Sequence, residues 1–136
     1  MKRFLPMGAL ALLLGSGAVM AQPAPVTSVR SVQDLAAVCD PAWSGVPRLE
    51  AIAYCQGFLT SMGQYHALLL QAHGSMGSMF CVPNPGPSIA ESGIAFANWA
   101  RANPANAQDP AMSGLLRWAH ATFPCPTPAR APRAQR

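Results

Sequence analysis

The sequence predicts an all-α fold, a small bundle of about four helices tied together by two disulfide bonds. Three observations lead to this prediction. Apolar residues recur at helical spacing in four segments, and no segment alternates apolar and polar residues for long. The chain also contains four cysteines, an even number, in only 136 residues. A chain of this length supports one domain with a modest core, to which disulfides would add stability.

Residues 1–21 have the features of a secretory signal peptide rather than of the folded domain. Lys2 and Arg3 precede an uncharged apolar stretch from Phe4 to about Met20, and the stretch is followed by Ala21. Glycine and serine interrupt the stretch, which falls short of the ~20 residues that a membrane-spanning helix needs. We therefore expect export, cleavage after Ala21 and no permanent membrane anchor.

The first expected element is a helix over 31–39, which follows an extended leader over 22–30. Ser31 and Asp34 form an acidic variant of the N-terminal capping box. Asp40-Pro41 ends the helix, because proline cannot donate the next backbone hydrogen bond. The apolar positions that share one face are Val32, Leu35, Ala36 and Cys39.

A second, longer helix is expected from about 48 to 72, with Pro47 in its first turn. Gly57 and Gly63 lie inside it, and we expect them to permit close packing or a kink. Gly74 is expected to end the helix as a C-cap glycine. The predicted buried stripe consists of Leu49, Ile52, Ala53, Gln56, Leu59, Met62 or Gly63, His66, Leu69 and Leu70.

A third helix is expected to begin at a Ser88–Glu91 capping box and to end at Asn103-Pro104. It follows a connection over 74–87 that is rich in Gly, Ser, Met and Pro. Its predicted buried face consists of Ile89, Gly93, Phe96, Ala97 and Ala100.

The fourth expected helix starts with Asp109 as N-cap and Pro110 as the first helical residue. It ends at the segment Phe123-Pro-Cys-Pro126. Its predicted face consists of Leu115, Leu116, Ala119, Thr122 and Phe123. The Pro/Ala/Arg-rich tail over 127–136 has a composition typical of disorder.

The cysteines Cys39, Cys55, Cys81 and Cys125 favour structural disulfides over a zinc or redox site, because no C-x-x-C motif is present. Spacing alone leaves three pairings open. If the last two helices are antiparallel, Cys125 comes close to Cys81, and the same hairpin reasoning pairs Cys39 with Cys55.

The charge pattern excludes a nucleic-acid surface on the folded body. Without residues 1–21 the chain has seven arginines, no lysine and five acids, a net charge of +2. Three of these arginines, Arg130, Arg133 and Arg136, lie in the tail, so the body carries −1. Nucleic-acid binding requires Lys and Arg clustered on one face.

The sequence offers no catalytic residues and no cofactor motif. It contains no G-x-S-x-G, H-E-x-x-H or phosphate-binding glycine loop, and its five acids are scattered. Thioether and imidazole groups could hold Cu(I), but methionine at helical spacing also fills core gaps. We interpret the following cluster as packing, with no metal site: Met62, His66, His73, Met76 and Met79.

The order of motifs resembles the Rap/Tai family of immunity proteins, which accompany type VI secretion amidase effectors in Gram-negative bacteria. The resemblance covers about residues 31–126. It is carried by Cys55-Gln56-Gly57-Phe58, Phe80-Cys81-Val82-Pro83, Trp99 to Asn103-Pro104, and Phe123-Pro-Cys-Pro126. Phe58 replaces a more usual Tyr, Asn103 stands where His is common, and the tail is outside the pattern.

The resemblance implies a periplasmic, disulfide-bonded helical protein, often a homodimer, that blocks the active site of a peptidoglycan-cleaving amidase. A structural or chaperone-like periplasmic protein of the same fold is the alternative, and a copper carrier is a weaker one. Exposed loops over 74–80 and 103–109 are the expected partner contacts, unless they merely connect helices. Their candidate residues are Ser75, Met76, Ser78, Met79, Asn103, Asn106 and Gln108.

Overall fold

The computed structural model describes residues 28–72 and 77–126. The predicted signal peptide, Gly74 and the tail over 127–136 lie outside this range. In the described residues the only β-pairing is an isolated bridge between Ser31 and Pro110. The elements are α1 (Val32–Cys39), α2 (Val46–Ala72), α3 (Ile89–Ala102), the 3-10 turn η1 (Pro104–Asn106) and α4 (Ala111–Thr122). The all-α fold of four helices with two disulfides is thus confirmed.

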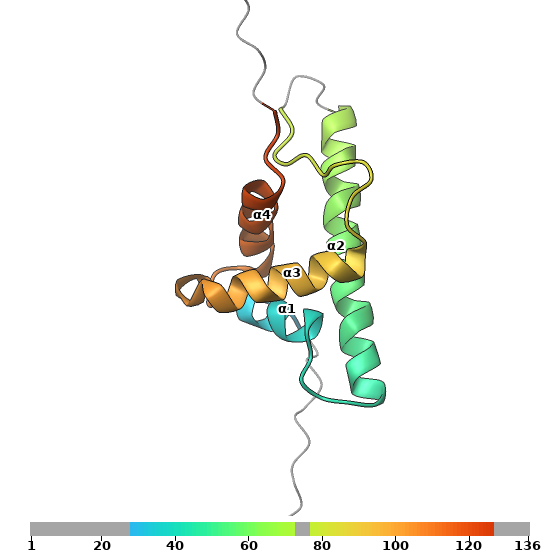
Figure 1. Cartoon of the computed structure of the whole chain (residues 1–136), viewed down its shortest axis with the longest axis vertical. Helices are drawn as coiled ribbons and strands as arrows, with labels where there is room; N and C mark the ends of the chain where they lie inside the picture. The colour runs from blue at the N-terminus through green and yellow to red at the C-terminus, as the bar shows by residue number, and fades with distance from the viewer. Residues whose placement is uncertain (1–27, 73–76, 127–136) are drawn as a thin grey trace, which may run out of the picture.

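The short helix α1 is the centre of the fold, because it packs against α2, α3 and α4. Its Val32 and Leu35 are fully buried, as are Phe96 of α3 and Leu115 of α4. Figure 1 shows α3 lying across α2, with α4 standing across α3. The two helices thus cross, and the antiparallel condition from which the Cys81–Cys125 pairing was inferred does not hold, although these two cysteines are bonded.

Both predicted capping boxes are confirmed. In α1 the Asp34 N–H donates to Ser31 Oγ at 3.2 Å, and the Ser31 N–H donates to Asp34 Oδ2 at 3.0 Å. In α3 the Glu91 N–H donates to Ser88 Oγ at 3.2 Å, and the Ser88 N–H donates to Glu91 Oε2 at 2.8 Å. These bonds satisfy helix-terminal N–H groups that would otherwise have no partner inside the helix.

The start of α4 differs from the prediction. Pro110, not Asp109, occupies the cap position, and no side chain caps the helix. The first N–H group of α4, that of Ala111, donates to the Arg30 carbonyl at 2.8 Å. The Asp109 carboxylate instead accepts a hydrogen bond from Arg117 Nη1 at 2.8 Å. Arg117 lies about two turns further along the chain, inside α4. The Asp109 carboxylate thus bonds to this guanidinium, whereas an N-cap Asp would bond to a backbone N–H of the helix.

The buried face of α2 is only partly the predicted one. Leu59, Met62 and His66 are buried as expected, but Leu49 is 66% exposed and Ala53 is exposed as well. The N-terminal half of the helix buries Ala51 and Cys55 instead. The physical reason is the Cys39–Cys55 disulfide, which fixes the side of α2 that faces α1.

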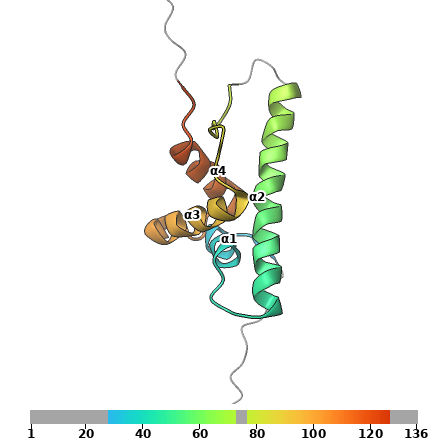
Figure 2. The ribbon, with the colours of Figure 1, turned by 45° about the vertical axis from the view of Figure 1, so that its right-hand side comes forward.

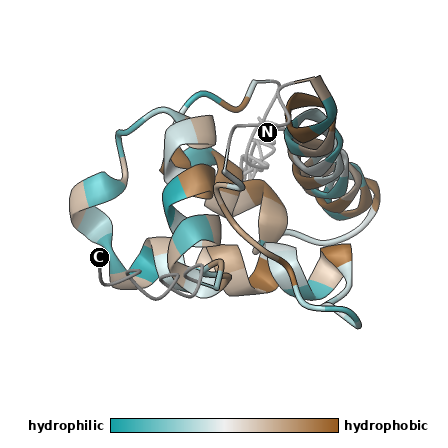
Figure 3. Ribbon diagram, turned by 90° about the horizontal axis from the view of Figure 1, so that it is seen from above, coloured by the Kyte–Doolittle hydropathy of each residue, from teal (hydrophilic) through white to brown (hydrophobic). Residues whose placement is uncertain are grey.

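Neither glycine inside α2 serves close packing. Gly57 and Gly63 are exposed, and a Cβ atom added at either position would meet nothing within 4 Å. Figure 3 shows hydrophobic residues on more than one side of this helix. Large exposed apolar side chains on α2 are Val46, Leu49, Tyr54, Tyr65 and Leu68.

The faces of α3 and α4 are close to the prediction, with three differences. Ile89 is 42% exposed and Thr122 is exposed, whereas Trp118, which was not predicted to face the core, is 4% exposed. The Trp118 ring packs edge-on against Phe96 and Phe123, with ring centroids 5.8 and 5.7 Å apart.

The two disulfides pair Cys39 with Cys55 and Cys81 with Cys125. The first joins α1 to α2. The second joins the connection before α3 to the chain after α4, where the Cys81 N–H also donates to the Phe123 carbonyl at 2.8 Å. The C-terminal half of α2 is accompanied by this connection rather than by another helix (Figure 2). None of the described helices has the length and apolar character needed to cross a membrane.

Candidate functional site

A groove of about 290 Å³ lies between α1, α3 and the η1 turn. We call it the α1–α3 groove. Most of its lining side chains are small, which leaves the space between the two helices open. The lining residues are Val32, Gln33, Ala36, Ala37, Asp40, Ala100, Arg101, Pro104 and Ala107.

The polar edge of the groove is formed by an ion pair. Arg101 Nη2 lies 2.8 Å from Asp40 Oδ2 and also donates to Asn98 Oδ1 at 2.6 Å. The two charged side chains are 54% and 36% exposed, so the pair contributes little to stability. Among the described residues, Nε and Nη1 of Arg101 make no hydrogen bond, which leaves them available to a ligand.

The loop over 103–109 is held in shape by the start of α1. The Val32 N–H donates to the Asp109 carbonyl at 2.9 Å, and the Gln33 N–H donates to the Ala107 carbonyl at 3.0 Å. The first N–H groups of a helix have no partner inside it, and here the loop supplies two. The groove therefore has one fixed wall made by this loop.

The three candidate contact residues in this loop have different surroundings. Asn103 Nδ2 donates to the Trp99 carbonyl at 2.8 Å, and Asn106 Oδ1 accepts from Arg117 Nη1 at 2.7 Å. Both side chains thus stabilise the end of α3 and the loop. Gln108 is exposed and does not line the groove, but its Nε2 lies 3.4 Å from Oε1 of Gln33, which does.

The other candidate loop lies elsewhere in the molecule. Ser75 and Met76 fall outside the described residues, while Ser78 is half-buried and Met79 is 40% exposed. This segment runs between the C-terminal end of α2 and α4, whereas the 103–109 loop lies beyond the far end of α3 (Figure 1). The structure therefore does not join the two loops into one surface, and each remains a separate candidate.

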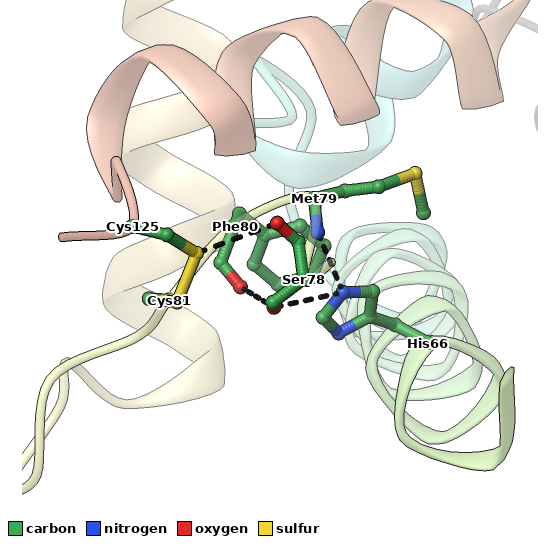
Figure 4. Close-up of a disulfide and its surroundings, with 6 residues drawn as sticks. All are labelled: His66, Ser78, Met79, Phe80, Cys81 and Cys125. Carbon is green, nitrogen blue, oxygen red and sulfur yellow. Dashed lines mark hydrogen bonds between the residues drawn. A yellow bond between two sulfur atoms is a disulfide. The ribbon is translucent and has the colours of Figure 1, made fainter. Parts of the chain in front are cut away.

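The described members of the Met/His cluster are Met62, His66 and Met79, of which Met79 is 40% exposed. Met62 is 7% exposed, and the His66 ring stacks on Phe80 with centroids 4.1 Å apart. His66 Nε2 accepts a hydrogen bond from the Met79 N–H at 3.3 Å (Figure 4). His73 and Met76 lie outside the described residues. Within the described ranges, no three His, Cys, Asp or Glu side chains are placed to hold a metal ion together.

Two carboxylates have clearly altered proton affinity, and both are helix caps. Hydrogen bonds from the Ser31 backbone and side chain lower the pKa of Asp34 below its ordinary value. The same bonds from Ser88 lower the pKa of Glu91. Both shifts follow from local capping, so they do not mark a catalytic centre.

The groove was missed at the sequence level. Gln33, Ala37 and Asp40 share one face of α1 at spacings of four and three, a signal that could have identified one wall. Nothing in the sequence relates that wall to Arg101, which lies 61 residues from Asp40.

Comparison with known proteins gave one match. The sequence profile of the Rap1a immunity proteins matches residues 31–125, a span that begins at the N-cap of α1 and ends at Cys125. Neither the comparison with curated proteins nor that with solved structures found a match.

Proposed function

Because this chain belongs to the Rap1a immunity protein family, we propose that it protects its own cell by binding and inhibiting a peptidoglycan-cleaving amidase effector. The observation that carries the proposal is the extent of the family match, which includes all four helices and both disulfides. The proposal thus concerns the whole domain rather than a single motif.

The periplasm is the compartment that we propose for this activity. Two disulfides in a small domain suit an oxidising compartment, and the N-terminal segment has signal-peptide features. Peptidoglycan lies in the same compartment, so an inhibitor there would meet the effector at its site of action.

The inhibition that we propose is steric and needs no covalent chemistry. The α1–α3 groove is the contact surface that the geometry favours, because its wall is preformed and a preformed surface loses less entropy on binding. An aliphatic side chain of the effector would enter between Ala36 and Ala100. The free N–H groups of Arg101 would bind a carboxylate beside it. A few such buried anchors supply most of the affinity in protein interfaces.

The experiment is a protection assay. Each cysteine amidase encoded by the strain that carries this gene is directed to the periplasm of a laboratory bacterium, with and without the full-length chain. We expect the chain to prevent lysis by one of these amidases and to bind it in a pull-down. Lysis with every amidase despite soluble chain would contradict the amidase assignment.

Two tryptophan variants in one loop test whether the effector binds in the groove. Ala107→Trp fills the groove, whereas Ala105 is exposed and does not line it. We expect Ala107→Trp to weaken binding at least about tenfold, the effect of losing one buried anchor, and Ala105→Trp to bind normally. The reverse result would place the contact on the outer face of the loop, and unchanged binding by both would exclude this loop.

A further inference from the structure

His66 links the C-terminal half of α2 to the segment over 77–81. The residue is 9% exposed, and its ring is stacked on Phe80. The same segment is tied to the end of α4 by the Cys81–Cys125 disulfide. His66 is therefore one contact through which α2 holds this segment.

Two polar groups of the segment converge on one ring nitrogen. The Met79 N–H donates to His66 Nε2 at 3.3 Å, and Ser78 Oγ lies 3.3 Å from the same nitrogen (Figure 4). A backbone N–H can only donate, so Nε2 must present its lone pair to Met79. The ring is then neutral, with its proton on Nδ1.

The Ser78 hydroxyl donates its single hydrogen to a group other than His66. Ser78 Oγ donates to the Phe80 carbonyl at 2.6 Å, and a hydroxyl has only one hydrogen to give. In the neutral state, Ser78 Oγ and His66 Nε2 therefore face each other as two acceptors. That contact becomes a hydrogen bond when Nε2 gains a proton.

We propose that His66 is a proton-operated latch on the segment over 78–80. The neutral ring accepts from the Met79 N–H. When Nε2 takes a proton from water, the imidazolium donates to Ser78 Oγ, which still donates to Phe80, and the Met79 N–H loses its acceptor. Histidine is the side chain whose ordinary charge change lies between about pH 5 and 8, which makes this residue type suited to a switch of this kind.

No charged side chain competes for this nitrogen in the described residues. The segment over 77–88 contains no ionisable residue apart from the disulfide-bonded Cys81. None of the charged or titratable groups on the described helices around it is hydrogen-bonded to His66. These groups are Arg48, Glu50, Tyr54 and Tyr65 on α2, Glu91 and Arg101 on α3, and Arg117 and His120 on α4. Within the described residues, the polar groups within hydrogen-bonding distance of Nε2 are therefore the Met79 N–H and Ser78 Oγ alone.

Nitrogen-15 NMR of the full chain tests the proposal directly. At high pH we expect a His66 ring protonated on Nδ1 alone. As His66 titrates, the protection of the Met79 amide against hydrogen exchange should fall about tenfold, the effect of one lost hydrogen bond. The Cys81 amide, which donates to Phe123, should keep its protection and serves as the internal control. Protonated Nε2 at high pH, or constant Met79 protection through the titration, would overturn the proposal.

Two variants make the test independent of any one mutant's folding. Ser78→Ala removes the acceptor of the imidazolium, so the His66 titration midpoint should move to lower pH, while that of exposed His120 stays in place. His66→Gln keeps an acceptor for Met79 but does not titrate, so Met79 protection should not depend on pH. If the glutamine variant fails to fold, the serine variant and the wild-type spectra decide, and an unmoved His66 midpoint in Ser78→Ala contradicts the latch.

Discussion

Gly114 of α4 lies directly against Val32 of α1, so that a Cβ atom at position 114 would overlap Val32 Cγ2. Val32 is fully buried, and its N–H bonds to the loop that forms one wall of the α1–α3 groove. The absence of a side chain at Gly114 therefore allows α4 to pack tightly on the central helix.

We predict that Gly114→Ala destabilises the protein despite the higher helix propensity of alanine. The added methyl group overlaps the fully buried, branched side chain of Val32, and overpacking of this kind costs about 1–3 kcal/mol. The free energy of unfolding in urea measures the effect. Adding Val32→Ala to Gly114→Ala should cost less than Val32→Ala alone, because the smaller side chain makes room for the methyl group.

Gly57→Ala is the matched control, because Gly57 lies in a helix with no neighbour within 4 Å of an added Cβ. Here the same substitution should stabilise the protein by about 0.5–1 kcal/mol. If both variants changed stability in the same direction, steric overlap at Val32 would not be the cause of the Gly114 effect.

Local signals predicted this fold better than long-range ones. The capping boxes at Ser31 and Ser88 depend on residues three positions apart, so the sequence displays them directly. The face of α2 could not be chosen in the same way, because apolar residues surround that helix and the bond to Cys39 selects its orientation.

The candidate site was even harder to predict from the sequence than the buried face of α2. The groove exists because α1 and α3 pack together with small residues at Ala36 and Ala100, positions far apart in the chain. Helical spacing predicted both alanines on buried faces, but it did not show that an open groove would remain between the two helices. Only the packing of the two helices turns these alanines into the lining of a groove.

The two disulfides should differ in their reactivity toward a reductant. Cys39 and Cys55 are 5% and 2% exposed, whereas Cys81 and Cys125 are half-buried. Thiol–disulfide exchange requires access of the attacking thiolate to a sulfur atom, so Cys81–Cys125 should be reduced first under native conditions. Alkylation and mass spectrometry along a dithiothreitol series would identify the order. Early labelling of Cys39 would contradict the prediction.

Stability should fall in acid partly because of Asp34. Hydrogen bonds from Ser31 lower the pKa of Asp34 in the folded state below the ordinary value of 3.8. A lowered folded-state pKa means that the stabilisation is fully present above about pH 5 and is lost as the pH falls through the folded-state value. Asp34→Asn should therefore have a flatter stability profile between about pH 5 and pH 2.

Urea unfolding at a series of pH values measures this profile. The matched control is Glu50→Gln, because Glu50 is an exposed acid of α2 without a hydrogen bond in the described residues. Its profile should follow that of the wild type. A wild-type slope in Asp34→Asn would show that the capping carboxylate does not contribute to the acid sensitivity.

Arg101→Gln should weaken partner binding while changing the free energy of unfolding only slightly. The Arg101–Asp40 pair is largely solvated, so its loss should change the free energy of unfolding by no more than about 1 kcal/mol. If Arg101 binds an effector carboxylate at the edge of the groove, affinity for the amidase should fall by about 10- to 100-fold, the usual effect of losing a charged hydrogen-bond partner. Arg48→Gln, which removes a bond to the Pro41 carbonyl outside the groove, is the control. Equal affinities for the two variants would place the effector on another surface, even if the chain protects against it.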